Sequence, residues 1–476
     1  MKNEGTTLDP DTEEFRKAGH QLVDWIAEYL GHPERHAVLS QVSPGDVKAQ
    51  FAASPSRHGK SYELLAREFE EKILPGVTHW NHPAFFAYFA ITGSQAGILG
   101  ELLSAALNIN GMLWKTSPAA TELETVALGW LRDALGLPSS FFGIINDTAS
   151  INTFLALAAA RESLGLSIRR EGMTGRELPR LKVYCSDQTH SSIEKAALAL
   201  GFGSNGVVKI ATDESFRMRI DLLVDAIARD RREGALPVAV VATTGTTSTA
   251  AVDPVEAIVE ITERERIWLH VDAAYGGSIA IIPEFRGFWR GVERADSMVI
   301  NPHKWLFTPV DCSVLYTRRP DVLKETFSLV PEYLKTTDSA EINYMDYGLQ
   351  LGRRFRALKL WMVIEHYGIE HLQDVIRGHI AMARRLGENL EAREDVELLA
   401  PQSMGVVVFR KIVRDSSGGV DEMASERLTS DLLSTMNASG KLFVSHTRLR
   451  DRYGIRVAVG NGATKWEHLE ALLKFL

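Results

Sequence analysis

Two short apolar runs, each followed by a residue that can do chemistry, most constrain the fold of this chain. The run at 297–300 leads into the stretch 301–307, which contains Lys304, and the run that begins at Trp268 ends at Asp272. Asp272 and Lys304 are 32 residues apart, which leaves room for a strand, a crossover and a parallel return strand. Open α/β sheets bind their ligands at the carboxyl ends of the strands. The sequence therefore predicts a parallel sheet with both residues at its carboxyl edge.

Lys304 stands among apolar and aromatic residues, and lysine is rarely buried unless it is paired or does chemistry. A lysine in such surroundings can form a Schiff base with an aldehyde, although this stretch alone allows an exposed loop lysine equally well. Asp272 favours the chemical interpretation, because pyridoxal phosphate enzymes need a lysine for the aldehyde, a carboxylate for the pyridine nitrogen and donors for the phosphate. A magnesium-binding acid of a nucleotide hydrolase is the alternative for Asp272, but the motif Gly-x-x-x-x-Gly-Lys-Ser/Thr is absent from the sequence.

The composition is that of an ordinary globular protein. The chain has 476 residues, 45% hydrophobic and 24% charged, enough for two or three domains. Its net charge of −8 does not indicate a nucleic-acid partner, which calls for a basic surface. The two cysteines, Cys185 and Cys312, imply no disulfide framework and are expected to be small buried side chains. With no secretory signal and no membrane-spanning run in the sequence, we expect a cytoplasmic protein without a membrane partner.

Two stretches in the first hundred residues have a pattern with more than one interpretation. Residues 12–30 have helical apolar spacing, and this helix could pack on its own chain or on a partner subunit. The stretch 78–89 holds His79 and His82 among aromatic residues. We expect no metal there, because no acid or cysteine set lies nearby at ligand spacing. An aromatic pocket wall is the preferred interpretation, since flat rings suit a flat apolar substrate.

A phosphate site is predicted where a strand-like run gives way to a helix. Small and hydroxyl residues at 143–150 precede a helical run at 153–164, and a helix N-terminus favours an anion. A plain capped helix is the alternative, but Lys304 and Asp272 favour the phosphate. The Gly-x-Gly-x-x-Gly pattern at 201–206 is rejected as a dinucleotide motif, because a helical run precedes it and a strand follows it.

The motifs His-Val-Asp-Ala-Ala-Tyr at 270–275 and Asn-Pro-His-Lys-Trp at 301–305 resemble those of the aromatic-L-amino-acid decarboxylase family, which are group II pyridoxal-phosphate-dependent decarboxylases. Further matching stretches run in the family's order from about Phe15 to Val459. The resemblance implies an α/β protein of the aspartate aminotransferase-like fold (fold type I), with a mostly parallel sheet between helix layers. We expect an N-terminal helical segment at 1–85, a large cofactor-binding domain at 86–370 and a small C-terminal α+β domain at 371–476.

The resemblance also implies roles for individual residues. Lys304 would hold pyridoxal 5'-phosphate, Asp272 would face its ring nitrogen, and His190 would stack on its ring beside the substrate carboxylate. Tyr333, in an irregular segment that resembles a catalytic loop, would return a proton to the substrate carbon. The other cofactor-binding residues implied are Ala149, Ser150, Thr246, Ala274, Asn301 and His303. The substrate-binding residues implied are Trp80, Tyr88, Phe89, Asn110, Met112 and Gly352. No metal site is expected.

Three positions refine the expected activity. Relatives that form aldehydes by oxidative deamination commonly carry phenylalanine at the position of Tyr333, and only a phenol can deliver a proton. Histidine-specific relatives commonly carry serine at the position of Gly352, so glycine favours a larger aromatic substrate. Many relatives have glycine at the position of Asp147, and here we expect the carboxylate to point away from the phosphate and to cap the following helix.

The sequence thus predicts decarboxylation of an aromatic L-amino acid (tryptophan, tyrosine, phenylalanine or dihydroxyphenylalanine) to the arylalkylamine and CO₂. An aromatic acetaldehyde synthase is the nearest alternative, and a non-catalytic protein that binds pyridoxal phosphate is a more distant one. The resemblance further implies a homodimer with active sites at the interface, in which residues 108–114 reach the site of the other subunit.

Overall fold

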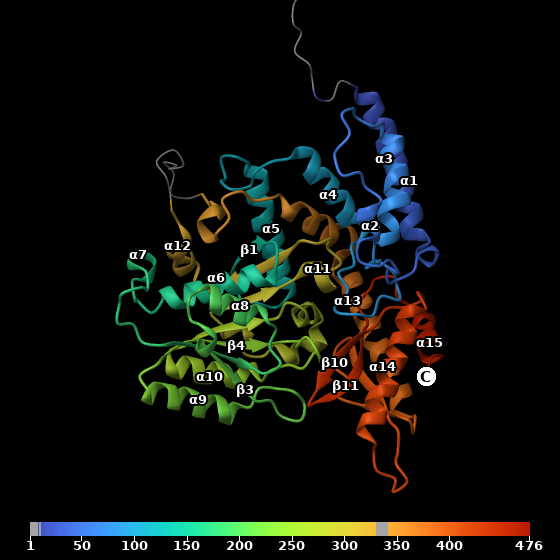
Figure 1. Ribbon diagram of the computed structural model, residues 1–476. Helices are drawn as coiled ribbons and strands as arrows, with labels where there is room; N and C mark the ends of the chain where they lie inside the picture. Colours follow the sequence, from blue (N-terminus) through green and yellow to red (C-terminus); the bar gives the residue numbers. More distant parts are fainter. Residues whose placement is uncertain (1–7, 9–10, 330–340) are drawn as a thin grey trace, which may run out of the picture.

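The computed structural model describes residue 8, residues 11–329 and residues 341–476, which are arranged around a seven-stranded sheet (Figure 1). The strand order is β1 (Phe142–Asn146), β7 (Ser313–Thr317), β6 (Ser297–Ile300), β5 (Trp268–Asp272), β4 (Leu236–Thr243), β2 (Leu181–Ser186) and β3 (Val207–Ile210). The pairs from β6 through to β3 are parallel, whereas β7 runs antiparallel to β6 and to β1. The mostly parallel sheet predicted from the sequence is confirmed.

Helices cover both faces of this sheet because alternate strand residues point to opposite sides. In β2, Tyr184 belongs to one hydrophobic cluster, while Val183 and Cys185 belong to another. The first cluster includes residues of α5 (Pro118–Ala134), α9 (Ile220–Arg232), α10 (Val255–Glu265) and α13 (Arg356–Glu391). The second includes residues of α6 (Ala149–Glu162), α8 (Ser192–Ala199) and α12 (Pro320–Phe327). Both cysteines are buried and unpaired, as expected.

A second, smaller sheet occupies the C-terminal part of the chain. It is antiparallel, in the order β10 (Ser445–Leu449), β11 (Arg452–Ala458), β9 (Val406–Lys411) and β8 (Val396–Leu398), and it is accompanied by α14 (Glu422–Ala438) and α15 (Trp466–Leu473). Phe85 and Phe86 pack into its core. The domain boundaries at 85/86 and 370/371 stay a prediction, and the second falls inside α13, near Gly368, where the helical backbone is interrupted (φ 71°).

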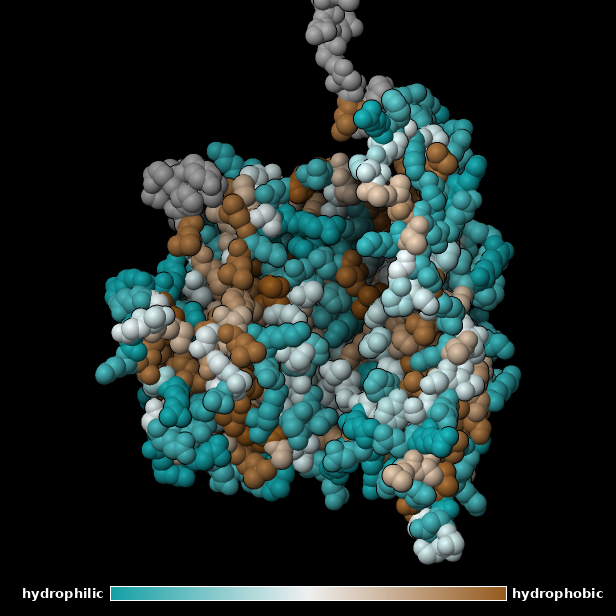
Figure 2. Space-filling view, viewed as in Figure 1, coloured by the Kyte–Doolittle hydropathy of each residue, from teal (hydrophilic) through white to brown (hydrophobic). Residues whose placement is uncertain are grey.

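The N-terminal helices are α1 (Thr12–Gly31), α2 (Asp46–Ala49), α3 (Tyr62–Glu68) and α4 (Gln95–Leu107). Asp11 starts α1, since its Oδ1 accepts the N–H of Glu13 (2.8 Å). This amphipathic helix buries none of its residues: Phe15 is 65% and Leu22 is 55% exposed. Figure 2 shows hydrophobic side chains at the surface near α1 and α4. None of the helices in the described parts of the chain is long and apolar enough to cross a membrane.

The remaining helical segments are short. They are the single turns α7 (Ile168–Glu171) and α11 (Pro302–Trp305), the π-helical turn Phe69–Ile73, and the 3₁₀ turns Pro33–Arg35, Leu74–Gly76, Ser204–Gly206, Gly276–Ile281, Pro283–Trp289, Val292–Arg294 and Tyr344–Tyr347.

Candidate active site

Lys304 lies on α11, directly after β6, at the carboxyl edge of the large sheet. Its Nζ is 5.2 Å from the centre of the Phe89 ring. Burial lowers the pKa of the Lys304 ammonium below its ordinary value; Asp272 opposes this shift, and the charge of Arg456 adds to it. This shift increases the fraction of neutral amine relative to a lysine in water, and the neutral amine is the form that attacks an aldehyde.

Asp272 ends β5, the strand beside β6. In the register of these two strands it lies opposite Val299. Its side chain is only 6% exposed, and Oδ1 accepts the N–H of Ala274 (3.1 Å). A buried carboxylate with spare acceptor capacity forms strong charge-assisted hydrogen bonds. Asp272 can thus hold a protonated ring nitrogen inside the site.

Lys304 and Asp272 open onto one cavity of about 210 Å³. Its walls come from the residues that follow β1, β2, β4, β5 and β6, where the strands of an α/β sheet place their ligands. Of the residues predicted for the site, the structure brings together around this cavity Phe89, Ala149, Ser150, His190, Asp272, Ala274, Asn301 and Lys304.

The N-terminus of α6 forms the anion-binding part of this cavity. The helix begins at Ala149, and the side chain of its N-cap residue, Thr148, makes no capping hydrogen bond. The N–H groups of the first turn are therefore available to an anion. The expectation that Asp147 caps α6 is wrong: its carboxylate accepts the N–H of Thr148 (2.6 Å) and the side-chain amide of Gln350 (3.2 Å). Asp147 is not among the residues that line the cavity.

His190 presents a neutral ring to the cavity. Its Nδ1 accepts the backbone N–H of Ser192 (3.2 Å) and lies 2.8 Å from the hydroxyl oxygen of that residue. Burial lowers the pKa of His190, an effect that Asp272 opposes. With Nδ1 acting as an acceptor, Nε2 carries the proton. The ring can therefore stack on a flat group and donate one hydrogen bond from Nε2.

Two predicted cofactor residues lie behind the cavity wall. The Thr246 hydroxyl accepts the N–H of Ala251 (3.0 Å) and lies 3.0 Å from that of Thr249, so it shapes the turn after β4. His303 is buried, and its Nδ1 accepts the N–H of Cys312 (2.9 Å). Burial lowers the pKa of His303 to about 3. Neither residue is part of the cavity lining, and their roles toward the cofactor stay a prediction.

The predicted pocket wall forms a group of rings beside the cavity. Phe89, which lines it, stacks on Tyr275 with ring centres 3.7 Å apart and planes 19° apart. Trp80 and Tyr88 stack on each other at 5.7 Å. Tyr88 is 55% exposed, so part of this wall faces outward. The wall offers a flat apolar surface next to Lys304.

The other predicted substrate residues form a second group away from this cavity. The Asn110 side chain accepts the N–H of Arg353 (2.9 Å) and donates to the sulfur of Met112 (3.5 Å). A Cβ added to Gly352 would lie 3.9 Å from the Asn110 amide nitrogen. Arg353 anchors the group through a buried ion pair with Glu124 (2.6 Å). Tyr333 lies outside the described residues.

Several residues of the site were not predicted from the sequence. Thr148, Ser192, Thr243, Gly245, Thr247 and Tyr275 line the cavity. The polar end of β4 is a local signal that could have identified Thr243, Gly245 and Thr247, because neighbouring strand ends already carried predicted residues. Tyr275 is the last residue of the motif at 270–275, but no role was predicted for it.

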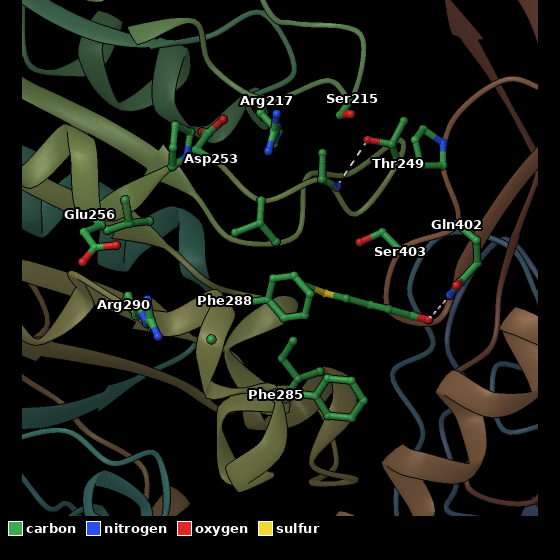
Figure 3. Close-up of a pocket in the computed structure, with 18 of the residues that line it drawn as sticks. Ser215, Arg217, Thr249, Asp253, Glu256, Phe285, Phe288, Arg290, Gln402 and Ser403 are labelled. Atoms are coloured by element: carbon green, nitrogen blue, oxygen red, sulfur yellow. Dashed lines mark hydrogen bonds between the residues drawn. The ribbon is translucent and has the colours of Figure 1, made fainter.

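The larger cavity of the described structure, about 720 Å³, lies between the start of α10, residues 283–290 and the loop at 400–404 (Figure 3). None of the predicted site residues lines it. Its charged lining includes the exposed Glu256 and Arg290 and the buried Asp253, whose carboxylate accepts the N–H groups of Met218 and Thr243. The lining contains no lysine or histidine. The larger volume therefore does not identify the reactive site, because Lys304, Asp272 and His190 line the smaller cavity.

The residues around the smaller cavity fit a phosphorylated pyridine aldehyde. An amine, a carboxylate and an uncapped helix N-terminus converge there, which match the aldehyde, the ring nitrogen and the phosphate of pyridoxal phosphate. Within the described ranges, no group of three or more His, Cys, Asp or Glu side chains is arranged to hold a metal ion.

Known proteins are similar to this chain over nearly its whole length. Residues 44–412 match the family model described as "Pyridoxal-dependent decarboxylase conserved domain". Tyrosine decarboxylase 3 of Petroselinum crispum is 40% identical, with 99% of this chain and 92% of that protein covered. Phenylacetaldehyde synthase of Arabidopsis thaliana is also 40% identical, with 99% and 97% covered. A crystal structure of Oryza sativa TDC with PLP and tryptamine superposes with a TM-score of 0.93 at 37% identity, with 99% of each chain covered.

These similarities agree with the geometry of the site. The fold is the aspartate aminotransferase-like fold of pyridoxal phosphate enzymes, and pyridoxal phosphate is the cofactor that the cavity accommodates. Since the family model spans most of the sequence and the relatives align over nearly all of it, the chain belongs to the family of pyridoxal-phosphate-dependent decarboxylases.

Proposed function

We propose that this decarboxylase acts on an aromatic L-amino acid, releasing the arylalkylamine and CO₂ in the cytoplasm. The observation that carries the proposal is the Phe89 ring, which lies over Lys304 (5.2 Å) and stacks on Tyr275 (3.7 Å). A flat apolar wall beside the reactive amine suits an aromatic side chain. Relatives named as tyrosine and tryptophan decarboxylases support this choice of substrate.

The chain's own residues bind and orient the reacting groups. When bound, pyridoxal phosphate supplies the electron sink for the carbon–carboxylate bond that breaks. Lys304 Nζ would hold the aldehyde carbon, and Asp272 would face the ring nitrogen and keep it protonated. The first turn of α6, at Ala149 and Ser150, binds the phosphate. His190 Nε2 donates a hydrogen bond to the substrate carboxylate, which fixes its direction relative to the ring plane.

Product analysis tests the proposal directly. The purified protein with pyridoxal phosphate is incubated with L-tryptophan, L-tyrosine, L-phenylalanine, L-dihydroxyphenylalanine and, as a non-aryl comparison, L-glutamate. We expect amine and CO₂ in equal amounts from at least one aromatic substrate, without hydrogen peroxide. Turnover of glutamate alone would contradict the proposed substrate class. A bound cofactor with no turnover on any substrate would contradict catalysis.

Tyr333 is proposed to decide between amine and aldehyde products. Relatives include a phenylacetaldehyde synthase, so the same family can lead to either product. We expect Tyr333→Phe to divert turnover from amine to aldehyde, because a phenyl ring cannot protonate the substrate carbon. Dissolved O₂ then takes the two electrons and becomes hydrogen peroxide, and water releases the aldehyde and ammonia. Chromatography of the amine and a peroxide assay measure the split. Tyr453→Phe, at a partly exposed tyrosine of β11 whose ring stacks on His446, is the matched control. An unchanged amine yield in Tyr333→Phe would overturn this role.

We also propose a homodimer, with the apolar surface of α1, α3 and α4 at the interface. Leu99, Leu103 and Leu107 recur every fourth residue on α4 and are 48%, 49% and 57% exposed. Apolar surface gathered in this way marks interaction sites. The segment with Asn110 and Met112 follows this helix, which agrees with a contribution to the partner's site.

Leu103→Asp is expected to convert the dimer to a monomer, because a carboxylate would be desolvated at the interface. Sedimentation velocity at micromolar concentration measures the change, and circular dichroism checks the fold. Met423→Asp, on α14 and 85% exposed, should leave the dimer intact. A wild-type chain that sediments as a monomer would refute the proposal.

A further inference from the structure

Arg456 is a buried cation beside the active site that none of the roles above explains. It lies on β11 and is 3% exposed. Among the described residues it has no carboxylate partner. Its Nε donates to the carbonyl of Ser248 (3.2 Å), Nη1 donates to the carbonyl of Tyr88, and Nη2 is buried without a partner. A buried charge without an opposite charge is costly, so its position requires a reason.

The Arg456 guanidinium and the Lys304 amine both lie close to the ring of Phe89. Its central carbon is 4.5 Å from the centre of the Phe89 ring, and Lys304 Nζ is 5.2 Å from the same centre. Phe89 stacks on Tyr275 (3.7 Å), and Tyr275 stacks on Trp305 (4.6 Å). Trp305 follows Lys304 in the chain. Phe89, Tyr275 and Trp305 therefore form a stack of rings. Arg456 contacts this stack at Phe89, and Trp305 at its other end is the residue after Lys304.

The two carbonyl contacts of Arg456 reach the two segments that border the cavity. Tyr88 precedes Phe89 and has a left-handed backbone (φ 50°), a conformation that few tyrosines adopt. Ser248 belongs to the turn that Thr246 shapes. One side chain from the small sheet thus fixes both the aromatic wall and the turn after β4.

We propose that Arg456 is a positioning residue that holds the Phe89 ring and the 246–251 turn in place and, as a nearby positive charge, favours the nucleophilic form of Lys304. A second positive charge disfavours the ammonium of Lys304, and burial acts in the same direction. Asp272 opposes both effects. His190 lines the same cavity, and the charges of Lys304 and Asp272 shift its pKa in opposite directions. The reactivity of Lys304 therefore depends on Asp272, Arg456 and His190 together. This inference rests on the proposed role of Lys304 as the residue that binds the cofactor.

The test measures covalent capture of pyridoxal phosphate by the cofactor-free full-length chain as a function of pH. The absorbance change gives the capture rate, and the midpoint of its pH profile reports the Lys304 pKa. For Arg456→Met we expect the midpoint to rise by about one pH unit, the order expected for two charges in a partly buried site. Arg456→Lys keeps the charge and should keep the midpoint, although it loses the forked contact with two carbonyls.

Arg410→Met is the matched control. Arg410 is also buried on the small sheet (2% exposed), but it pairs with Glu397 and Glu422, so its loss should leave the midpoint unchanged. Arg456→Gln, which keeps a donor for the Tyr88 carbonyl, replaces Arg456→Met if that variant does not fold. A midpoint that stays at the wild-type pH in the uncharged variant, or a fall in rate at every pH without a shift, would overturn the proposal. Lys304→Ala must abolish the capture signal; if it does not, the role of Lys304 fails instead.

Discussion

Lys304→Ala is expected to lower steady turnover by more than about 10³-fold, equivalent to about 4 kcal/mol of lost transition-state stabilisation. The reason is that Nζ would be the group that binds the cofactor aldehyde, and alanine has no amine for this role. Amine formation in the presence of excess pyridoxal phosphate measures the loss. Absorbance of the protein should show that the covalent lysine–cofactor bond is gone, while the phosphate site still retains the cofactor non-covalently.

Lys195→Ala provides the control for this variant. Lys195 is exposed on α8, close in sequence to His190, and it contributes to lowering the pKa of that histidine. Its loss should change turnover by less than about threefold, because exposed charge pairs interact weakly. Wild-type turnover in Lys304→Ala, with an unchanged melting temperature, would show that another group binds the cofactor.

The sequence predicted those site residues that come directly after a buried strand. Asp272 and Lys304 each come directly after an apolar run, and the structure pairs those runs as β5 and β6 in parallel. Ala149, His190 and Asn301 follow other strands in the same way. Such strand ends meet at one edge of a parallel sheet, so a local pattern is enough to predict that distant residues converge.

Residues held by tertiary contacts could not be predicted in this way. Arg456 lies in an apolar run that predicts only a strand, and its approach to Phe89 depends on how the small sheet docks on the large one. The α6 helix begins at Ala149, before the predicted helical run, because its first turn carries no apolar period. Asp147 was predicted to cap α6, but its Oδ2 instead accepts a hydrogen bond from the side chain of Gln350, which is distant in sequence.

The residues of the aromatic wall were predicted from the sequence, but their positions relative to the cavity were not. Trp80, Tyr88 and Phe89 come from one stretch, yet only Phe89 lines the cavity. The left-handed backbone at Tyr88 separates the two neighbouring rings, and no sequence rule assigns that conformation to a tyrosine. Gly352 and Asn110 lie together, as a shared substrate role requires, but away from Lys304 of the same chain, which is consistent with the proposed dimer.

Asp272→Asn should lower turnover by roughly 10² to 10⁴-fold, because removing one member of a buried charge pair costs about 3–5 kcal/mol. The amide keeps the shape of the carboxylate but cannot keep the ring nitrogen protonated. The variant has a second expected effect, of opposite sign to that of Arg456→Met. Asp272 raises the pKa of Lys304, so its removal should move the pH profile of cofactor capture to lower pH while turnover falls.

This combination separates the proposed role from general damage to the site, which would slow capture and turnover together at every pH. Asp296→Asn is the matched control: Asp296 is also largely buried beside β6 and accepts the N–H of Leu269 (2.9 Å), but it lies at the amino end of the strand. Its loss should lower the melting temperature without shifting the capture profile. If Asp272→Asn instead retained wild-type turnover, the ring nitrogen would not need this carboxylate. The opposite charges of Asp272 and Arg456 would then act only on the pKa of Lys304.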